Sequence, residues 1–236
     1  MRGALAGHSL ADGIPNSQLA VAFGADLVLL NMFSGNGLAD LKARLGRPVR
    51  VNVEPLEEAP EHRRASRDNL KRLEDADFIV VTANPDAKVD TQAVLSAAEL
   101  ARETVPGALV FAGRMHGSGG RGLMEPEDTA RLAGVVDGVL VPAPGTVPGS
   151  RESVVSELMD AAHAEGSLAV ATVGTSQEGA DSQTVRMLAL AAKRAGADVL
   201  HLGDAGTSGI AEPMNILTAS LAVRGRRHTY RRMAMR

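Results

Sequence analysis

The feature that most constrains the fold is a short motif that recurs four times, each time directly before an apolar segment. It reads Gly24-Ala25-Asp26, Asp75-Ala76-Asp77, Val136-Asp137-Gly138 and Gly196-Ala197-Asp198. The aspartates at 26, 77, 137 and 198 lie 51, 60 and 61 residues apart, and each interval has room for two strand–helix units. Four such quarters give eight strands and eight helices, the count of a (β/α)8 TIM barrel. An open doubly wound sheet with the same alternation is the alternative.

Apolar segments and helix-period segments alternate along the whole chain. We expect strands at Ala4–His8, Leu27–Met32, Val49–Glu54, Phe78–Thr82, Leu109–Met115, Gly138–Val141, Leu168–Val173 and Val199–Gly203. Helices are expected between them, among others at Asn16–Phe23, Glu61–Glu74, Thr91–Glu103, Glu125–Leu132, Arg151–Ala164, Ser182–Ala195 and Glu212–Val223. Most of these strands are apolar throughout, which is typical of parallel strands covered by helices. We expect a single α/β domain, a barrel over residues 1–223 followed by a basic tail over 224–236.

Composition excludes several classes of function. The chain has no Cys, so thiol nucleophiles and thiolate metal sites are excluded. Its four lysines lie on predicted helices or loops, which argues against a Schiff-base aldolase or a pyridoxal phosphate enzyme. Aromatic residues make up 2% and the formal net charge is −3, which argues against nucleic acid as a partner. No apolar run is long enough for a membrane span and no leader pattern is seen, so we expect a cytoplasmic protein without a membrane partner.

The tail carries six of the arginines between residues 224 and 236 and the only Tyr of the chain. A basic segment of this kind is able to contact nucleic acid, but an arm that packs on the acidic barrel or on a second subunit is the plainer interpretation. With a barrel whose base is otherwise open, this indicates a homo-oligomer.

In a TIM barrel the active site lies at the C-terminal ends of the strands. The polar side chains at those ends are divided by expected role. We expect Glu54 and Asp204 to act as an acid/base pair with His116 assisting, and His8, Asn31, Asn84 and Arg114 to bind the substrate. An ion pair of Glu54 with Arg114 or Arg50 is the structural alternative. Glu54, His116 and Asp204 would be the ligands if the protein used a divalent cation, Mg²⁺ or Mn²⁺, and otherwise we expect no cofactor. His62, His163 and His201 are expected to have no role.

Two glycine-rich loops, after the expected strands 168–173 and 199–203, predict a phosphate site. Backbone N–H groups and hydroxyls there are suited to an anion at a helix N-terminus. The expected phosphate-binding residues are Gly174, Thr175, Ser176, Gly203, Gly206 and Thr207. Two tight strand-to-helix turns are the alternative. Asp204 would repel a phosphate, so we expect it to face the reacting carbon or to bind a cation.

Four strings carry a resemblance that spans nearly the whole chain. They are FGADLVLLNMF (23–33), PAPGTVP (142–148), GTSQEGAD (174–181) and RRHTYRRMA (226–234). They resemble an uncharacterised bacterial (β/α)8-barrel family, which is similar in outline to the ribulose-phosphate-binding barrels. A more distant likeness is to the phosphoenolpyruvate mutase and isocitrate lyase superfamily. The chain departs from the latter because it lacks the Asp-Gly-Asp-Thr-Gly metal loop, and Val53-Glu54-Pro55 only loosely matches the acidic pair.

The sequence therefore predicts an enzyme that acts on a small phosphorylated metabolite, a sugar phosphate or a phosphorylated oxo-acid, by proton abstraction. The expected class is an isomerase, an epimerase or a lyase. A transferase or cyclase of a specialised pathway with a phosphorylated donor is one alternative, and a non-catalytic ligand-binding barrel is another.

Overall fold

The computed structural model describes residues 9–31, 33, 37–82, 88–117, 122–174, 177–203 and 210–235. The strands are β1 (Val28–Leu30), β2 (Val49–Val53), β3 (Phe78–Val81), β4 (Leu109–Ala112), β5 (Gly138–Pro142), β6 (Leu168–Val173) and β7 (Val199–Leu202). The helices are α1 (Asn16–Ala22), α2 (Leu38–Leu45), α3 (Arg67–Lys71), α4 (Thr91–Thr104), α5 (Pro126–Ala133), α6 (Glu152–Ala164), α7 (Ser182–Arg194) and α8 (Pro213–Ala234), with 3-10 turns η1 (Glu61–Arg63) and η3 (Gln177–Gly179).

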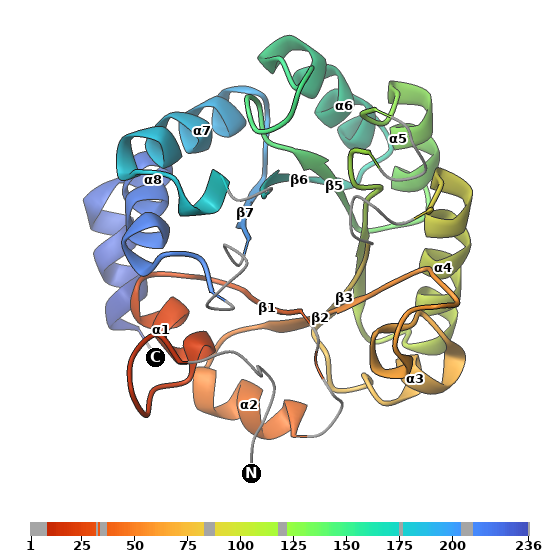
Figure 1. Ribbon diagram of the computed structural model, residues 1–236, viewed down its shortest axis with the longest axis horizontal. Coiled ribbons are helices and arrows are strands. Elements are labelled where there is room, and N and C mark those ends of the chain that lie inside the picture. Colours follow the sequence, from red (N-terminus) through yellow and green to blue (C-terminus); the bar gives the residue numbers. More distant parts are fainter. Residues whose placement is uncertain are drawn as a thin grey trace.

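The strands form one parallel sheet whose spatial order is the sequence order, β1 to β7. Figure 1 shows this sheet curled into a ring with the helices on its outside. The predicted α/β architecture with a barrel-like parallel sheet is thus confirmed. The eighth strand expected at Ala4–His8 lies outside the described residues, so the count of eight stays a prediction.

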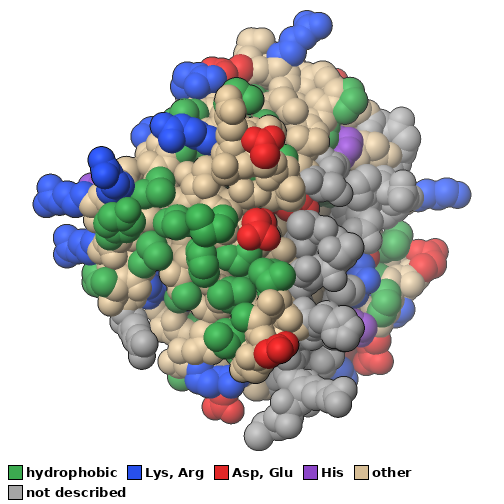
Figure 2. Space-filling model, turned by 60° about the vertical axis from the view of Figure 1, so that its left-hand side comes forward, with side chains coloured by type: hydrophobic (Ala, Val, Ile, Leu, Met, Phe, Trp, Pro, Cys, Tyr) green, Lys and Arg blue, Asp and Glu red, His purple; other side chains and the backbone are tan. Residues whose placement is uncertain are grey.

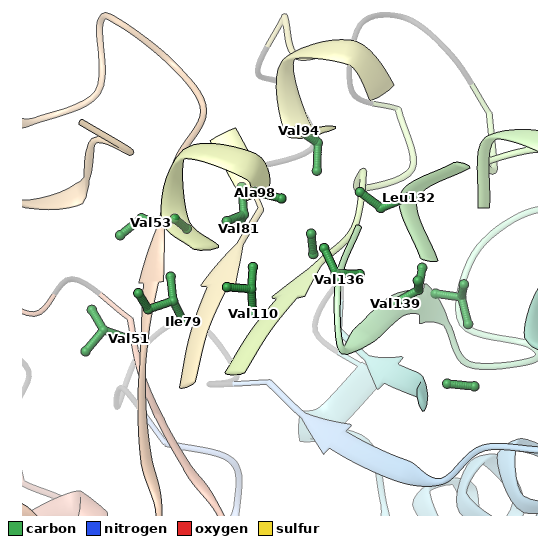
Figure 3. Packing of buried hydrophobic residues seen from close by; sticks show 14 of the residues in the cluster. Val51, Val53, Ile79, Val81, Val94, Ala98, Val110, Leu132, Val136 and Val139 are labelled. Carbon is green, nitrogen blue, oxygen red and sulfur yellow. The ribbon is translucent and has the colours of Figure 1, made fainter. Parts of the chain in front are cut away.

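The main hydrophobic core lies between the sheet and the ring of helices. Val51, Ile79, Val110 and Val139 project from four neighbouring strands toward the helices that carry Ala98 and Leu132 (Figure 3). A second, smaller cluster fills the lumen of the ring with Val80, Phe111, Leu140 and Val170. Residues on one strand therefore alternate between the helix-facing core and the lumen, as the two-residue period of a strand requires.

Three of the four repeated aspartates hold the base of the sheet, the end where the strands begin. Asp77 accepts a hydrogen bond from the Val49 N–H of β2, Asp137 from Val110 of β4 and Asp198 from Ala169 of β6, each at 2.8 Å. Each carboxylate also pairs with a basic side chain at the end of the helix before that strand. These partners are Lys42 for Asp77, Arg102 for Asp137 and His163 for Asp198. The repeated aspartate thus caps the first strand of each of these three pairs and has a structural role.

The fourth aspartate, Asp26, receives its cations from the other end of the chain. Arg224 and Arg232 of α8 both pair with it, and Arg224 also donates to the Gly24 carbonyl at 2.7 Å. Helix α8 breaks at Gly225, which has a left-handed φ of 74°, and resumes through the tail to Ala234. The tail therefore packs on the base of β1. The last helix was expected to end near Val223, and this boundary is wrong because the helix resumes beyond the glycine.

Two other sequence-based assignments are corrected. The single helix expected at 61–74 is divided into η1 and α3, because residues beside Arg64 extend the end of β2: Ala65 N–H donates to the Glu54 carbonyl at 2.8 Å. Strand β2 is an exception to the expectation that most strands are apolar throughout, because its lumen-facing positions Arg50 and Asn52 are polar.

The outer surface has one notable apolar area. Figure 2 shows hydrophobic side chains gathered on the side of the molecule that carries α1, α7 and α8. The exposed Leu10 and Ile14 precede α1, Met187 lies on α7 and Met214 on α8. The predicted homo-oligomer stays a prediction. No helix among the described residues is both long and apolar enough to cross a membrane.

Candidate functional site

A hollow lies at the C-terminal ends of β4, β5 and β6. Its cavity volume is about 20 Å³, and Arg114, His116, Thr172 and Gly174 are among its lining residues. Three residues chosen from the sequence, Arg114, His116 and Gly174, therefore meet around one space. Gly113 allows the close packing of this wall, because a Cβ on it would lie 2.5 Å from the Leu140 carbonyl oxygen.

Arg114 is buried, with 5% of its surface exposed. Its Nη2 donates to the carbonyl oxygens of Gly122 at 3.0 Å and Leu123 at 3.1 Å. The guanidinium thus anchors the segment that begins at Gly122 and leads into α5. The role of Arg114 in substrate binding stays a prediction. A side chain with that role would also hold this segment in position.

Glu54 follows β2 and is 5% exposed. Its Oε1 accepts hydrogen bonds from Arg63, at 2.8 Å from Nε and also from Nη2. The ion pair anticipated with Arg114 or Arg50 is therefore made with Arg63, which the backbone pairing of Glu54 with Arg64 brings close. Glu54 is not among the residues that line the hollow.

Asn31, the residue after β1, lies near Asn52 of β2. The Asn52 side-chain nitrogen is 3.5 Å from the Asn31 Oδ1, the limit of a hydrogen bond. These amides border the lumen, on the opposite part of the sheet from the hollow at β4 to β6. Asn31 and His116 therefore belong to different parts of the same end of the barrel.

The predicted phosphate loops contain a buried carboxylate. Glu178 of η3 is 3% exposed, and its Oε1 would lie 3.0 Å from a Cβ built on Gly203. The buried Asn215 of α8 fixes this loop by donating to the carbonyl oxygens of Glu178 at 3.0 Å and Ala180 at 2.7 Å. A phosphate beside Gly203 would meet this negative charge, whereas Gly174 borders the hollow. Outside the described residues lie His8, Asn84, Thr175, Ser176, Asp204, Gly206 and Thr207.

Sequence reasoning missed two residues in the lumen. Arg50 of β2 is 3% exposed, and its guanidinium lies over the Phe78 ring at 5.7 Å from the ring centre. Burial lowers the Arg50 pKa to about 10. His201 of β7, which was expected to have no role, has its pKa lowered to about 3, first by burial and then by the positive charge of Arg50. His201 is therefore neutral at pH 7.

The alternation of β2 was the available signal for this polar lumen. In Val-Arg-Val-Asn-Val (49–53) the valines face the helices and the polar residues face inward. The inner face of a barrel strand is normally filled by apolar side chains. Polar residues on the inner face of β2 therefore indicate that the lumen has a polar function. Among the described residues, no three His, Asp or Glu side chains lie close enough together to hold a metal ion.

Comparisons with known proteins agree on the fold. A family model described as "Domain of unknown function (DUF7916)" matches residues 3–236. The sequence matches none of the curated proteins. A putative fructose-1,6-biphosphate aldolase from Coccidioides immitis is similar in structure, with a TM-score of 0.63, 12% identity and coverage of 94% of this chain and 91% of that chain.

Two further structures resemble the chain. Thiamine phosphate pyrophosphorylase from Pyrococcus furiosus has a TM-score of 0.54 at 11% identity, covering 88% of this chain and 87% of that one. A chitinase from Chromobacterium violaceum has a TM-score of 0.56 at 10% identity, covering 91% and 98%. The names of the three proteins differ in activity, so this likeness shows the barrel-like fold alone.

Proposed function

We propose that this chain, which belongs to the DUF7916 family, is an enzyme that acts on a small phosphorylated metabolite at the C-terminal end of its sheet. The observation that carries the proposal is the hollow in which Arg114, His116 and Gly174 meet. It combines a cation, a titratable imidazole and an accessible backbone, the groups that a small anionic substrate requires. The hollow also lies at the end of the barrel where active sites are found in this fold.

In this function His116 is the acid–base group. A neutral imidazole takes a proton from the carbon beside a carbonyl group, and the electron pair of the broken C–H bond moves to the carbonyl oxygen as an enediolate. That carbon carries a hydroxyl group, whose proton moves to the former carbonyl oxygen, and return of the abstracted proton to the neighbouring carbon gives the isomer with the carbonyl group on the first carbon. Arg114 borders the same hollow and stabilises the oxyanion. Glu54 is the weaker candidate for the base, because Arg63 already occupies its Oε1.

The phosphate is assigned to the side of the hollow bordered by Gly174 rather than to Gly203, where Glu178 would repel it. The names of two similar structures refer to phosphorylated compounds, a fructose bisphosphate and thiamine phosphate, which supports a substrate of that kind. A lyase and an isomerase share the proton-abstraction step. A divalent cation held partly by Asp204 and the transferase or cyclase alternative stay predictions.

The test is deuterium incorporation. Wild-type protein is incubated in D2O with dihydroxyacetone phosphate, with and without Mg²⁺ and EDTA, and loss of the C–H signal beside the carbonyl is followed by proton NMR. We expect exchange in the wild type, and a decrease of about 100-fold or more in His116→Gln, because general acid–base groups contribute that much. His228→Gln is the matched control, since His228 is exposed on α8.

Equal exchange rates in wild type and His116→Gln would refute the role of His116. Absence of exchange with every ketose phosphate and phosphorylated oxo-acid supplied would contradict the proposed function.

A further inference from the structure

The fourfold repeat shows which lumen residues the fold itself requires. Val49, Val110 and Ala169 are equivalent, because the N–H of each binds the repeated aspartate. The next residue in each quarter faces the lumen, and these residues are Arg50, Phe111 and Val170. Two of the three quarters fill this position with an apolar side chain. The fold itself therefore does not require a cation at position 50.

The same comparison applies to His201, which follows its repeated aspartate, Asp198, by three residues. The equivalent residues after the other three aspartates are Leu29, Val80 and Leu140, all members of the apolar lumen cluster. His201 is thus the single polar residue at its position in the repeat. Arg50 and His201 both replace apolar residues of the fold, and both face the lumen, since their neighbours Val49, Val51, Leu200 and Leu202 pack against the helix-facing core.

Neither side chain has its polar atoms satisfied within the described residues. Nε and Nη1 of Arg50 and Nδ1 of His201 are buried and have no hydrogen-bond partner there, and neither do Asn52 Oδ1 and Thr82 Oγ1. Arg50 makes no ion pair with any described carboxylate; the contact that is seen is the one with the Phe78 ring. A buried cation without an anion is unfavourable, and proteins normally pair it.

We propose that Arg50 and His201 form an anion subsite in the lumen, which binds an oxyanion group, the carboxylate or phosphate of a small ligand that enters from the C-terminal end. The subsite extends the proposed function, since a ligand with one acidic group in the hollow would place a second one here.

The chemistry of the lining supports an anion. A guanidinium offers only donors, and a neutral imidazole adds one N–H. The Asn52 side-chain nitrogen already has Asn31 Oδ1 as a partner, and its unpaired Oδ1 would accept from a hydroxyl group of the ligand. Asn52 lies two residues nearer to the C-terminal end than Arg50 on the same face of β2, and Thr82 follows the end of β3. The polar lining therefore extends from Arg50 toward the mouth. At the level of Arg50 the lumen contains Phe78, its register partner on β3, which is stacked on Phe111 with ring centres 5.5 Å apart.

The experiment measures anion binding to the unliganded protein, without turnover. Thermal unfolding midpoints and calorimetric titrations are recorded with sodium phosphate, sodium acetate and phosphoenolpyruvate, in a buffer otherwise free of small anions. We expect a saturable rise of the midpoint in the wild type. In Arg50→Met the half-saturating concentration should increase about tenfold or more, since hydrogen bonds to a charged group contribute this much. Arg131→Met is the matched control, because it removes the same charge from the exposed surface of α5.

A response to phosphate and acetate that is lost in Arg50→Met supports a subsite that free anions also fill. A response to phosphoenolpyruvate alone, lost in the same variant, supports a subsite for the acidic group of the ligand. Absence of any saturable response in the wild type, or its retention in Arg50→Met, overturns the proposal. If Arg50→Met and Arg50→Gln both fail to fold, the guanidinium is structural and the proposal also fails. A loss of exchange in His116→Gln is independent of these outcomes, so the two proposals can fail separately.

Discussion

Charged and polar side chains have partners at the base of the sheet, whereas in the lumen some of their polar atoms have none among the described residues. At the base, each of Asp77, Asp137 and Asp198 has a strand N–H and a basic side chain as partners. In the lumen, the buried Arg50 and the half-buried His201 keep buried polar atoms that no described residue satisfies. The base charges stabilise the fold, whereas the buried charge of Arg50 makes it less stable. The comparison teaches that the two sets serve different purposes, folding at the base and ligand binding in the lumen.

Removing a buried arginine from each region is the strongest test of this contrast. Arg47, at the base, is 6% exposed but donates to the carbonyl oxygens of Gly46, Arg232 and Met235. Arg47→Met should lower the free energy of unfolding by about 2 kcal/mol, because three backbone carbonyl groups lose their charged donor. Arg50→Met should raise it by about 3 kcal/mol in ligand-free protein, since each unit of the lowered pKa corresponds to about 1.4 kcal/mol. Urea unfolding at pH 7 measures both. A loss of stability in Arg50→Met similar to that in Arg47→Met would remove the contrast.

Acid should destabilise the lumen through His201. Its pKa in the folded protein is about 3, below the ordinary value of 6.5. Between these values the unfolded chain binds a proton that the folded chain does not, so stability falls as the pH drops below 6.5. At pH 5 this amounts to about 2 kcal/mol. Urea unfolding at pH 7 and pH 5 should show this extra loss in the wild type and in His228→Gln, but not in His201→Gln. An unchanged pH dependence in His201→Gln would mean that the imidazole is not buried in the neutral form.

The smallest effects are expected from variants that remove the two partners of Asp137, the Val110 N–H and the Arg102 side chain, one at a time. Asp137→Ala should lower the free energy of unfolding by about 1.5 kcal/mol, because the buried Val110 N–H loses its acceptor. Asp137→Asn keeps an acceptor and loses only the ion pair with Arg102, so we expect about 0.5 kcal/mol, and the same from Arg102→Met. Urea unfolding of the three variants gives the comparison. Equal losses in Asp137→Ala and Arg102→Met would show that the surface ion pair, rather than the strand N–H, makes the base stable.

The base was largely predictable from the sequence, and the lumen was not. The motif around Asp77, Asp137 and Asp198 repeats at near-constant spacing, so the succession of strand–helix units that it marks could be predicted. Arg50 and His201 each occur in one quarter only, and a single deviation from a repeat carries no pattern. The polar inner face of β2 was visible as an alternation, but the apolar neighbouring strands outweighed it.

The candidate site was predictable only in its location. Arg114, His116 and Gly174 were expected at the C-terminal ends of strands, and the structure brings them to one hollow. The partner of Glu54 could not be foreseen, because Arg63 reaches it through the irregular η1 turn after β2. Glu178 lies in the glycine-rich loop expected after residues 168–173. Its burial against Gly203 could not be foreseen, because it depends on Asn215 of α8, far along the chain.

The pairing of Asp26 with Arg224 and Arg232 has a consequence for the order of folding during synthesis. A ribosome releases the N-terminal quarter first. Arg224, which pairs with Asp26, lies 198 residues further along the chain and is therefore made much later. The quarter that is translated first is therefore the last to have its base completed, and until that moment the Asp26 carboxylate lacks the two arginines that pair with it.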